Sequence, residues 1–176
     1  MTSSKSATLQ KAVRDIPDFP KKGIIFKDIT PILKDPRLFK TAIDLMGKKL
    51  SQKKIDYVVG IESRGFIFSP MIAYRLKAGF VPVRKAGKLP YLTHKTSYAL
   101  EYGEAVLEIH KDAIEKGANV VIVDDLLATG GTALAAAQLV EELGAKVVGL
   151  TFLIELAFLN GKKKLSRYDI HTVIRY

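Results

Sequence analysis

The sequence contains no cysteine, and this absence excludes disulfide bonds, thiolate metal sites and cysteine nucleophiles. It also lacks any run of about 18 apolar residues, the length that a membrane-spanning helix requires. The N-terminal stretch MTSSKSATLQKAV has no apolar core of the kind found in signal peptides. No internal repeat and no linker rich in Gly, Ser or Pro divides the 176 residues. We therefore expect a single domain, residues 1–176, in the cytoplasm and without membrane contact.

Positive charge is in clear excess, with 28 basic against 18 acidic residues and a formal net charge of +10. Such an excess is typical of proteins that bind anions, whether nucleic acid, membrane surfaces or phosphorylated metabolites. The lysines are spread over separate segments (KKG, GKKLSQKK, NGKKK) and do not form one tract with interleaved aromatic residues. This spread disfavours a nucleic-acid interface and leaves phosphorylated metabolites or a solvated basic face.

Apolar segments alternate with helix signals along most of the chain. Strands are expected in IDYVVGI, FVPVRK, EAVLEIH, NVVIV and KVVGLTFLIE, and helices in KDPRLFKTAIDLMGKKL, RGFIFSPMIAYRLKAG and residues 132–143. Asp35 suits the N-cap of the first helix and Gly79 a left-handed C-cap of the second, while Pro82 places its strand near a sheet edge. Continuous apolar strands separated by helices predict an α/β fold with a mostly parallel central sheet flanked by helices.

The segment 87–103 is polar, studded with aromatic residues and without a sustained period, so we expect a long functional loop there. In the strand that follows, Leu107 and Ile109 are expected to point inward and Glu108 and His110 outward. The C-terminal piece DIHTVIRY is strand-like and has no assigned role.

Two adjacent carboxylates, Asp124 and Asp125, follow the apolar strand NVVIV. In parallel sheets ligands bind beyond the carboxyl ends of the strands. Side chains alternate along a strand, so the two acids point in different directions and suit the vicinal hydroxyls of a ribose. The next five residues offer backbone amides and two hydroxyls at a helix start, which suits a phosphate; they are Ala128, Thr129, Gly130, Gly131 and Thr132. Acids and turn together predict a ribose-5-phosphate site.

Other sites fit this pattern less well. A Walker loop needs a Lys after its glycines, and a dinucleotide fingerprint places the glycines before the acid. A G-x-S-x-G nucleophile is excluded at Ser63, because Gly60 lies three residues before it. The simplest structural alternative is a tight turn between strand and helix, with Asp125 as a helix cap.

The segment VVIVDDLLATGGT resembles the signature of type I phosphoribosyltransferases, which bind phosphoribosyl pyrophosphate (PRPP) with this element. Further blocks resemble the adenine phosphoribosyltransferases in order; they are IPDFPKKGIIFKDITPIL, VGIESRGFIF, VPVRKAGKLP, TSYALEYG and ELAFLNGKKKL. The resemblance covers most of the chain. It implies a homodimer with an N-terminal base-binding hood (about 1–34) and a flexible lid loop (about 87–103). It also implies Mg²⁺-dependent transfer from PRPP to adenine, giving AMP and pyrophosphate.

The resemblance also implies residue roles. The residues expected to bind the ribose and its 5′-phosphate are Asp124, Asp125 and residues 128–132. Those expected to bind pyrophosphate are Ser63, Arg64, Arg84, Lys85, Lys88 and Tyr102. Those expected to bind adenine are Ile25, Phe26, Lys27 and Leu126, and the catalytic residues are Glu101 and Arg64. Phe26 would stack on one face of adenine and Leu126 on the other, while backbone groups of Ile25 and Lys27 read its edge. Glu101 would be the acid/base group, and Arg84 would act across a dimer interface. Mg²⁺ is expected on substrate oxygens and water, with no direct protein ligand.

Two further details come from the same resemblance. The Glu62–Ser63 peptide bond is expected to be cis, and Ser69 stands where the family usually carries Gly, close to the start of the expected helix. Without the resemblance, the segment from Arg84 to Lys88 would be interpreted as a solvated basic turn, and Phe26 as a core aromatic residue.

Two other functions stay open. The first is transfer to another purine base, such as guanine or hypoxanthine. The second is a PRPP-sensing regulator that binds nucleic acid, which the positive charge supports. The glutamate-bearing lid segment and the lack of an appended helix-turn-helix segment disfavour the regulator.

Overall fold

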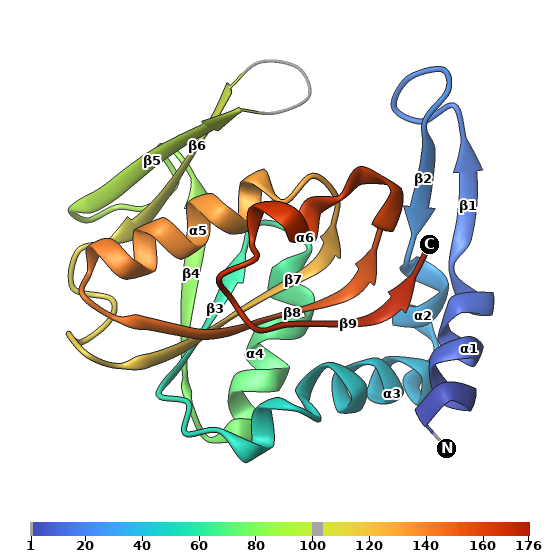
Figure 1. Ribbon diagram of the computed structural model, residues 1–176, viewed down its shortest axis with the longest axis horizontal. Coiled ribbons are helices and arrows are strands. Elements are labelled where there is room, and N and C mark those ends of the chain that lie inside the picture. Colours follow the sequence, from blue (N-terminus) through green and yellow to red (C-terminus); the bar gives the residue numbers. More distant parts are fainter. Residues whose placement is uncertain (1, 100–103) are drawn as a thin grey trace. The chain divides into compact units, whose positions relative to one another are not determined.

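The computed structural model describes residues 2–99 and 104–176 (Figure 1). The chain divides into two compact units, residues 1–45 and 46–176. Within the described residues, the second unit is built on a seven-stranded sheet of order β5-β6-β4-β3-β7-β8-β9. These strands are β3 (Tyr57–Ile61), β4 (Gly79–Lys85), β5 (Thr93–Ala99), β6 (Glu104–His110), β7 (Asn119–Leu127), β8 (Lys146–Glu155) and β9 (Ile170–Arg175). The five neighbouring strands β4, β3, β7, β8 and β9 are parallel to one another. β6 is antiparallel to β4, and β5 is antiparallel to β6. The predicted α/β fold with a mostly parallel sheet is thus confirmed.

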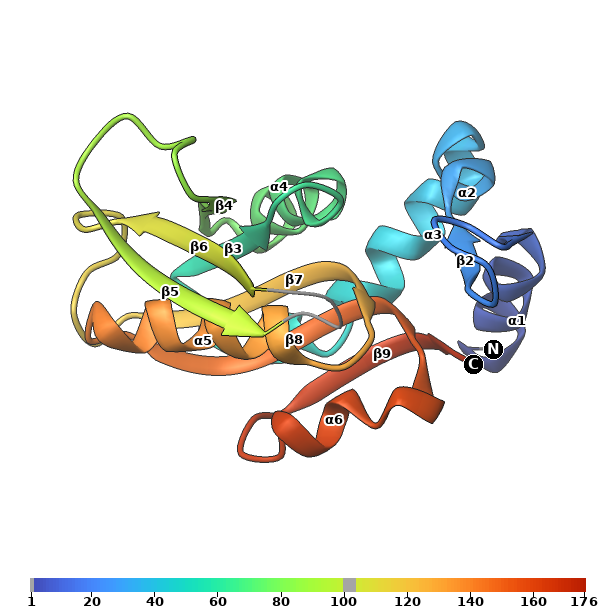
Figure 2. The same cartoon turned by 90° about the horizontal axis from the view of Figure 1, so that it is seen from above.

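Two helices, α4 (Gly65–Leu76) and α5 (Gly131–Glu142), cover opposite faces of this sheet (Figure 2). Successive side chains of a strand point to opposite faces of the sheet. Val59 and Ile122 point to the face covered by α5 and belong to the core that contains Leu139 of that helix. Gly60 points to the other face, towards α4. A Cβ at Gly60 would lie 2.0 Å from Ser69 Oγ, so the glycine lets α4 pack directly on β3. The shorter helices of this unit are η1 (Leu50–Gln52), η2 (Ala157–Leu159) and α6 (Gly161–Lys164). Across the described ranges, no helix is both long enough and apolar enough to span a bilayer.

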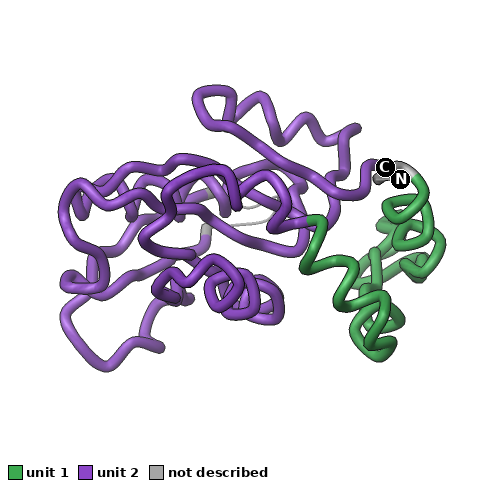
Figure 3. Tube along the Cα trace, turned by 90° about the horizontal axis from the view of Figure 1, so that it is seen from below, with its two compact units in different colours: residues 1–45 green, residues 46–176 purple. Residues whose placement is uncertain are grey.

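The first unit contains a two-stranded sheet and short helices (Figure 3). Its elements are α1 (Thr2–Ala12), β1 (Arg14–Pro17), β2 (Ile25–Asp28), α2 (Thr30–Lys34) and most of α3 (Pro36–Gly47). β1 and β2 are antiparallel. Asp35 Oδ1 accepts hydrogen bonds from the amides of Arg37 (2.8 Å) and Leu38 (3.1 Å), which confirms the predicted cap of α3.

The C-cap prediction for the second helix was wrong. The left-handed residue after α4 is Lys77 (φ 55°), and Gly79 instead opens β4. Gly79 is small for a packing reason, because a Cβ there would lie 2.7 Å from the Tyr57 ring. Pro82 pairs with β3 alone, since the pairing of β4 to β6 begins at Arg84. This local edge agrees with the predicted position of Pro82.

Part of the expected loop at 87–103 is a strand. Thr93 to Ala99 form β5, which pairs with β6 along its whole length. Threonine and tyrosine favour strands, and a hairpin partner supplies the backbone hydrogen bonds that a polar sequence does not reveal. Glu108 on β6 is 1% exposed, so its predicted outward position was also wrong.

Ser69 lies inside α4, where it is fully buried. Its hydroxyl donates to the carbonyl oxygen of Gly65, the first residue of the helix, at 2.7 Å. The residue that departs from the resembling family therefore packs against β3 one helical turn from the start of α4.

Candidate functional site

A cleft of about 310 Å³ opens where β3, β4 and β7 end. Its lining is Glu62, Ser63, Arg64, Lys85, Tyr98, residues 124–130, Thr132 and Ala133. The predicted ribose, phosphate and pyrophosphate residues thus largely meet in one place, although they come from three separate parts of the chain.

The acid pair lies within β7 and not beyond it, which corrects the predicted strand end. β7 pairs with β3 only as far as Val123, whereas its pairing with β8 continues to Leu127. The predicted boundary came too early because the buried apolar run stops at Val123, while the strand continues on one neighbour. Asp124 and Asp125 therefore stand on a stretch of strand whose β3 side is open to the cleft.

Asp125 is enclosed by protein, whereas Asp124 is half-buried. Asp125 is 4% exposed, and its Oδ2 lies 2.8 Å from Arg64 Nε. Asp124 Oδ1 accepts a hydrogen bond from the Asp125 amide at 2.9 Å. Burial raises the pKa of both side chains, and the charge of Asp125 adds to the rise at Asp124, whereas Arg64 opposes both. Poorly solvated carboxylates of this kind are good acceptors for ligand hydroxyl groups.

A close approach of two backbones places Arg64 beside Asp125. The Glu62–Ser63 peptide bond is cis, as the resemblance implies, and Arg64 then precedes the first residue of α4. A Cβ at Gly65 would lie 2.9 Å from the Val123 carbonyl oxygen and 3.0 Å from Asp124 Oδ1. Glycine at this position lets the start of α4 pack directly on β7.

The turn into α5 forms another wall of the cleft. Gly130 adopts φ +81°, a left-handed conformation that glycine reaches without strain, and it occupies the N-cap of α5. No side chain caps this helix from Gly130, so its first amides are available to a ligand. The positive end of the helix dipole adds to their attraction for an anion. Gly131 is the first residue of α5 and adjoins the lining residues.

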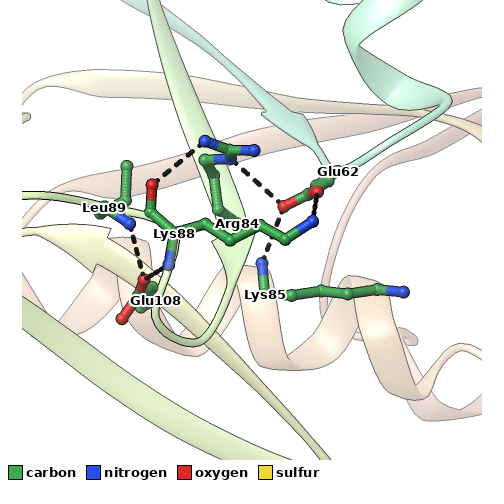
Figure 4. A network of polar contacts seen from close by, with 6 residues as sticks. All are labelled: Glu62, Arg84, Lys85, Lys88, Leu89 and Glu108. Carbon is green, nitrogen blue, oxygen red and sulfur yellow. Dashed lines mark hydrogen bonds and ion pairs between the residues drawn. The ribbon is translucent and has the colours of Figure 1, made fainter.

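Glu62 contacts the basic residues at the end of β4 and in the turn after it (Figure 4). Its carboxylate oxygens accept from Lys88 Nζ (2.6 Å), the Lys85 amide (3.1 Å) and Arg84 Nε (3.2 Å). Burial by itself would raise the pKa of Glu62, but these three contacts lower it to about 2. Arg84 and Lys88 are therefore already ion-paired. The Lys85 side chain extends away from this network and lines the cleft, and no described residue forms an ion pair with its ammonium group.

We expect Glu62→Gln to lower the free energy of unfolding by about 1–2 kcal/mol at pH 7. The folded-state pKa of about 2 lies below the ordinary value of 4.5. The charged form therefore stabilises the folded chain above about pH 4.5, and this contribution disappears as the pH falls towards 2. Urea unfolding at pH 7 and pH 3 checks the prediction, with exposed Glu115→Gln as the control. An equal loss at both pH values would contradict it.

Three of the predicted base-binding residues, Ile25, Phe26 and Lys27, belong to the first unit, whereas the fourth, Leu126, lies on β7 and lines the cleft. Phe26 lies on β2, half-buried, with the Phe19 ring edge-on at 5.2 Å. Lys27 Nζ is 2.7 Å from Asp15 Oδ1, so the Lys27 side chain is ion-paired within that unit. Glu101 and Tyr102, predicted for catalysis and pyrophosphate, lie outside the described residues.

Sequence reasoning missed two residues of the cleft. It assigned no role to Tyr98, because the segment around it was taken as irregular; strand alternation from β5 places its ring at the wall. Glu62 was noted only for its peptide bond. The sequence did carry a signal for this ion-pair network. Glu62 is an acid directly after one expected strand, and the next expected strand ends in the basic residues Arg84 and Lys85, with Lys88 shortly after them.

Comparison with known proteins agrees with this geometry. Residues 28–174 match the family described as "Phosphoribosyl transferase domain". The adenine phosphoribosyltransferase of Pseudothermotoga lettingae is 56% identical over 168 residues, which cover 96% of this chain and 99% of that protein. The crystal structure of the Rhodothermus marinus adenine phosphoribosyltransferase is 52% identical, with a TM-score of 0.95 and 99% of each chain covered. The Saccharomyces cerevisiae enzyme, complexed with adenine and an imino-altritol bisphosphate, is 47% identical, with a TM-score of 0.93 and coverage of 97% and 99%.

Proposed function

Because the chain belongs to the adenine phosphoribosyltransferase family, we propose that it is a purine-salvage enzyme that transfers the 5-phosphoribosyl group of PRPP to adenine, giving AMP and pyrophosphate. The observation that carries this function is the cleft in which an acid pair on β7 adjoins the uncapped start of α5. One end of that cleft suits sugar hydroxyls and the other suits a phosphate.

The ribose and its 5′-phosphate bind along β7 and the turn that follows it. Asp124 and Asp125 accept hydrogen bonds from the ribose hydroxyls, and residues 128–132 surround the phosphate with backbone amides and the hydroxyls of Thr129 and Thr132. As the bond between ribose and pyrophosphate breaks, positive charge develops on the sugar ring. The nearby carboxylates stabilise that charge, because they are fixed in place before the reaction begins.

The pyrophosphate leaves across the turn after β3. Ser63 and Arg64 line the cleft on one side and Lys85 on the other. Arg84 and Lys88 add positive potential from within the Glu62 network, which offsets part of their charge. Tyr102 is a further proposed pyrophosphate contact. Arg64 thus has two roles, because it binds pyrophosphate and also forms an ion pair with Asp125.

Adenine is held by stacking and by backbone hydrogen bonds. Phe26 and Leu126 contact the two faces of the ring, and backbone groups of Ile25 and Lys27 read its edge. The ion pair between Lys27 and Asp15 supports this assignment, because it leaves the Lys27 side chain engaged elsewhere. The half-buried Phe26 keeps part of its ring surface open to a ligand.

Mg²⁺, a homodimer and a cytoplasmic location complete the proposal. The donor set of the cleft fits a metal that arrives on substrate oxygens, because Asp125 faces Arg64 and Asp124 accepts the Asp125 amide. When bound, Mg²⁺ neutralises part of the pyrophosphate charge. In the homodimer, Arg84 would reach the dimer interface.

The function is tested by pyrophosphate release from PRPP in the presence of Mg²⁺ and each of several purines. Release that depends on adenine, and is far slower with guanine or hypoxanthine, is the expected result. Equal or faster rates with the oxopurines would overturn the choice of base. Binding of RNA or DNA with a steep salt dependence, and no transfer to any base, would favour the regulator.

We expect Glu101→Ala to lower kcat by at least about tenfold and to leave the KM for PRPP within about twofold. An acid/base group at the purine acts on the transition state and contributes little to the binding of PRPP. Steady-state kinetics with varied PRPP measure both constants. Equal losses in kcat and PRPP affinity would argue against an acid/base role.

A further inference from the structure

A short segment far along the chain is interlocked with the turn that precedes α5. Gly161, the buried first residue of α6, meets this turn backbone to backbone. A Cβ at Gly161 would lie 2.1 Å from the Ala128 carbonyl oxygen and 3.1 Å from the Gly130 amide nitrogen. In return, a Cβ at Gly130 would lie 2.6 Å from the Gly161 carbonyl oxygen. Each glycine therefore leaves just enough room for the other's backbone.

These contacts restrict the turn because every atom involved belongs to a main chain. A flexible side chain can rotate away from an added methyl group, but a carbonyl group moves only if its whole peptide segment moves. The segment around Gly161 is itself anchored. Lys162 Nζ donates to Glu155 Oε2 on β8 at 2.6 Å, Thr172 on β9 donates to the same oxygen at 2.9 Å, and Leu165 is fully buried in the core.

We infer that Gly161 is a positioning residue that fixes residues 128–131 in the conformation that receives the 5′-phosphate of the substrate. This inference rests on the proposed function, since it takes that turn as the phosphate site. Gly161 does not line the cleft, so it acts through the turn and touches no ligand. The ligand class concerned is a ribose carrying a 5′-phosphate.

The test compares two buried glycines of the same unit, Gly161→Ala and Gly149→Ala. At Gly149 the nearest atom to an added Cβ is the Asp169 carbonyl oxygen at 3.5 Å, an ordinary contact, so this variant is the matched control. For Gly161→Ala we expect the KM for PRPP to rise by about tenfold to a hundredfold, with the KM for adenine within about twofold. The stabilisation of the folded chain by ribose 5-phosphate, measured as a shift in Tm, should also be lost. Gly149→Ala should match the wild type in all three measurements.

A Gly161→Ala protein with wild-type affinity for PRPP and ribose 5-phosphate would overturn the inference. If that variant does not fold, Lys162→Met decides, because it loosens α6 without adding an atom at the turn. In Lys162→Met, an increase of about threefold in the KM for PRPP, with no change in the KM for adenine, supports the positioning role. If neither KM value changes, or if both change equally, the positioning role is refuted. Failure of the proposed function is distinguishable: the wild type would then release no pyrophosphate with adenine, while ribose 5-phosphate binding would still report on Gly161.

Discussion

Replacing Asp125 with asparagine lowers kcat/KM for PRPP by about a thousandfold in our expectation. Asparagine keeps the shape of the side chain but removes the charge that lies 2.8 Å from Arg64 Nε. The substitution also removes the carboxylate that would stabilise positive charge on the ribose ring. Initial rates of pyrophosphate release at varied PRPP measure the effect.

The control for this substitution is Asp112→Asn, an exposed aspartate outside the cleft. It loses the same charge and should keep the wild-type rate, which separates a local role from a change in net charge. A fall of less than tenfold in Asp125→Asn would show that the buried carboxylate is not part of the reacting site.

Replacing Lys85 with methionine raises the KM for PRPP and the inhibition constant of pyrophosphate by about 30-fold to 100-fold. A charged hydrogen bond contributes about 1.5–3 kcal/mol, and the Lys85 ammonium lines the cleft with no ion-pair partner among the described residues. Methionine preserves most of the apolar stem and removes the ammonium group, with its charge and its hydrogen-bond donors. Inhibition of the forward reaction by added pyrophosphate measures the second constant.

Lys88→Met provides the comparison for Lys85→Met. Lys88 Nζ lies 2.6 Å from Glu62 Oε1, so much of its charge is already balanced within the protein. Its loss should change both constants by less than about fivefold. If Lys88→Met proved as harmful as Lys85→Met, the Glu62 network would have to open during binding.

The fold class followed from the sequence because its strands are buried on both faces. Such strands form continuous apolar segments, and two of the helices have a recognisable start or stop, at Asp35 before α3 and at Gly144 after α5. Strand β5 and the end of β7 could not be predicted in this way. Both depend on backbone pairing with a neighbour, which leaves no apolar period in the segment itself.

Site residues were predictable where the chemistry lies in consecutive residues. The acids Asp124 and Asp125 and the turn after them form one continuous stretch that folds back on a single cleft. The use of the cations was not predictable, because it depends on contacts between strands. Glu62 follows β3 directly and Arg84 lies on the neighbouring β4, and only their spatial proximity shows that Arg84 is paired while Lys85 is exposed to the cleft.

The exposed turn after β4 contains the Lys88–Leu89 peptide bond, which a trypsin-like protease would cut. Hydrogen bonds hold the chain in place on both sides of that bond. The amides of Lys88 and Leu89 both donate to Glu108 Oε1, at 2.9 and 3.0 Å, from a carboxylate that is itself buried. A protease binds its substrate as an extended strand, so the Lys88–Leu89 bond must first release both amides. Surface accessibility therefore overstates how readily this turn is cut after Lys88.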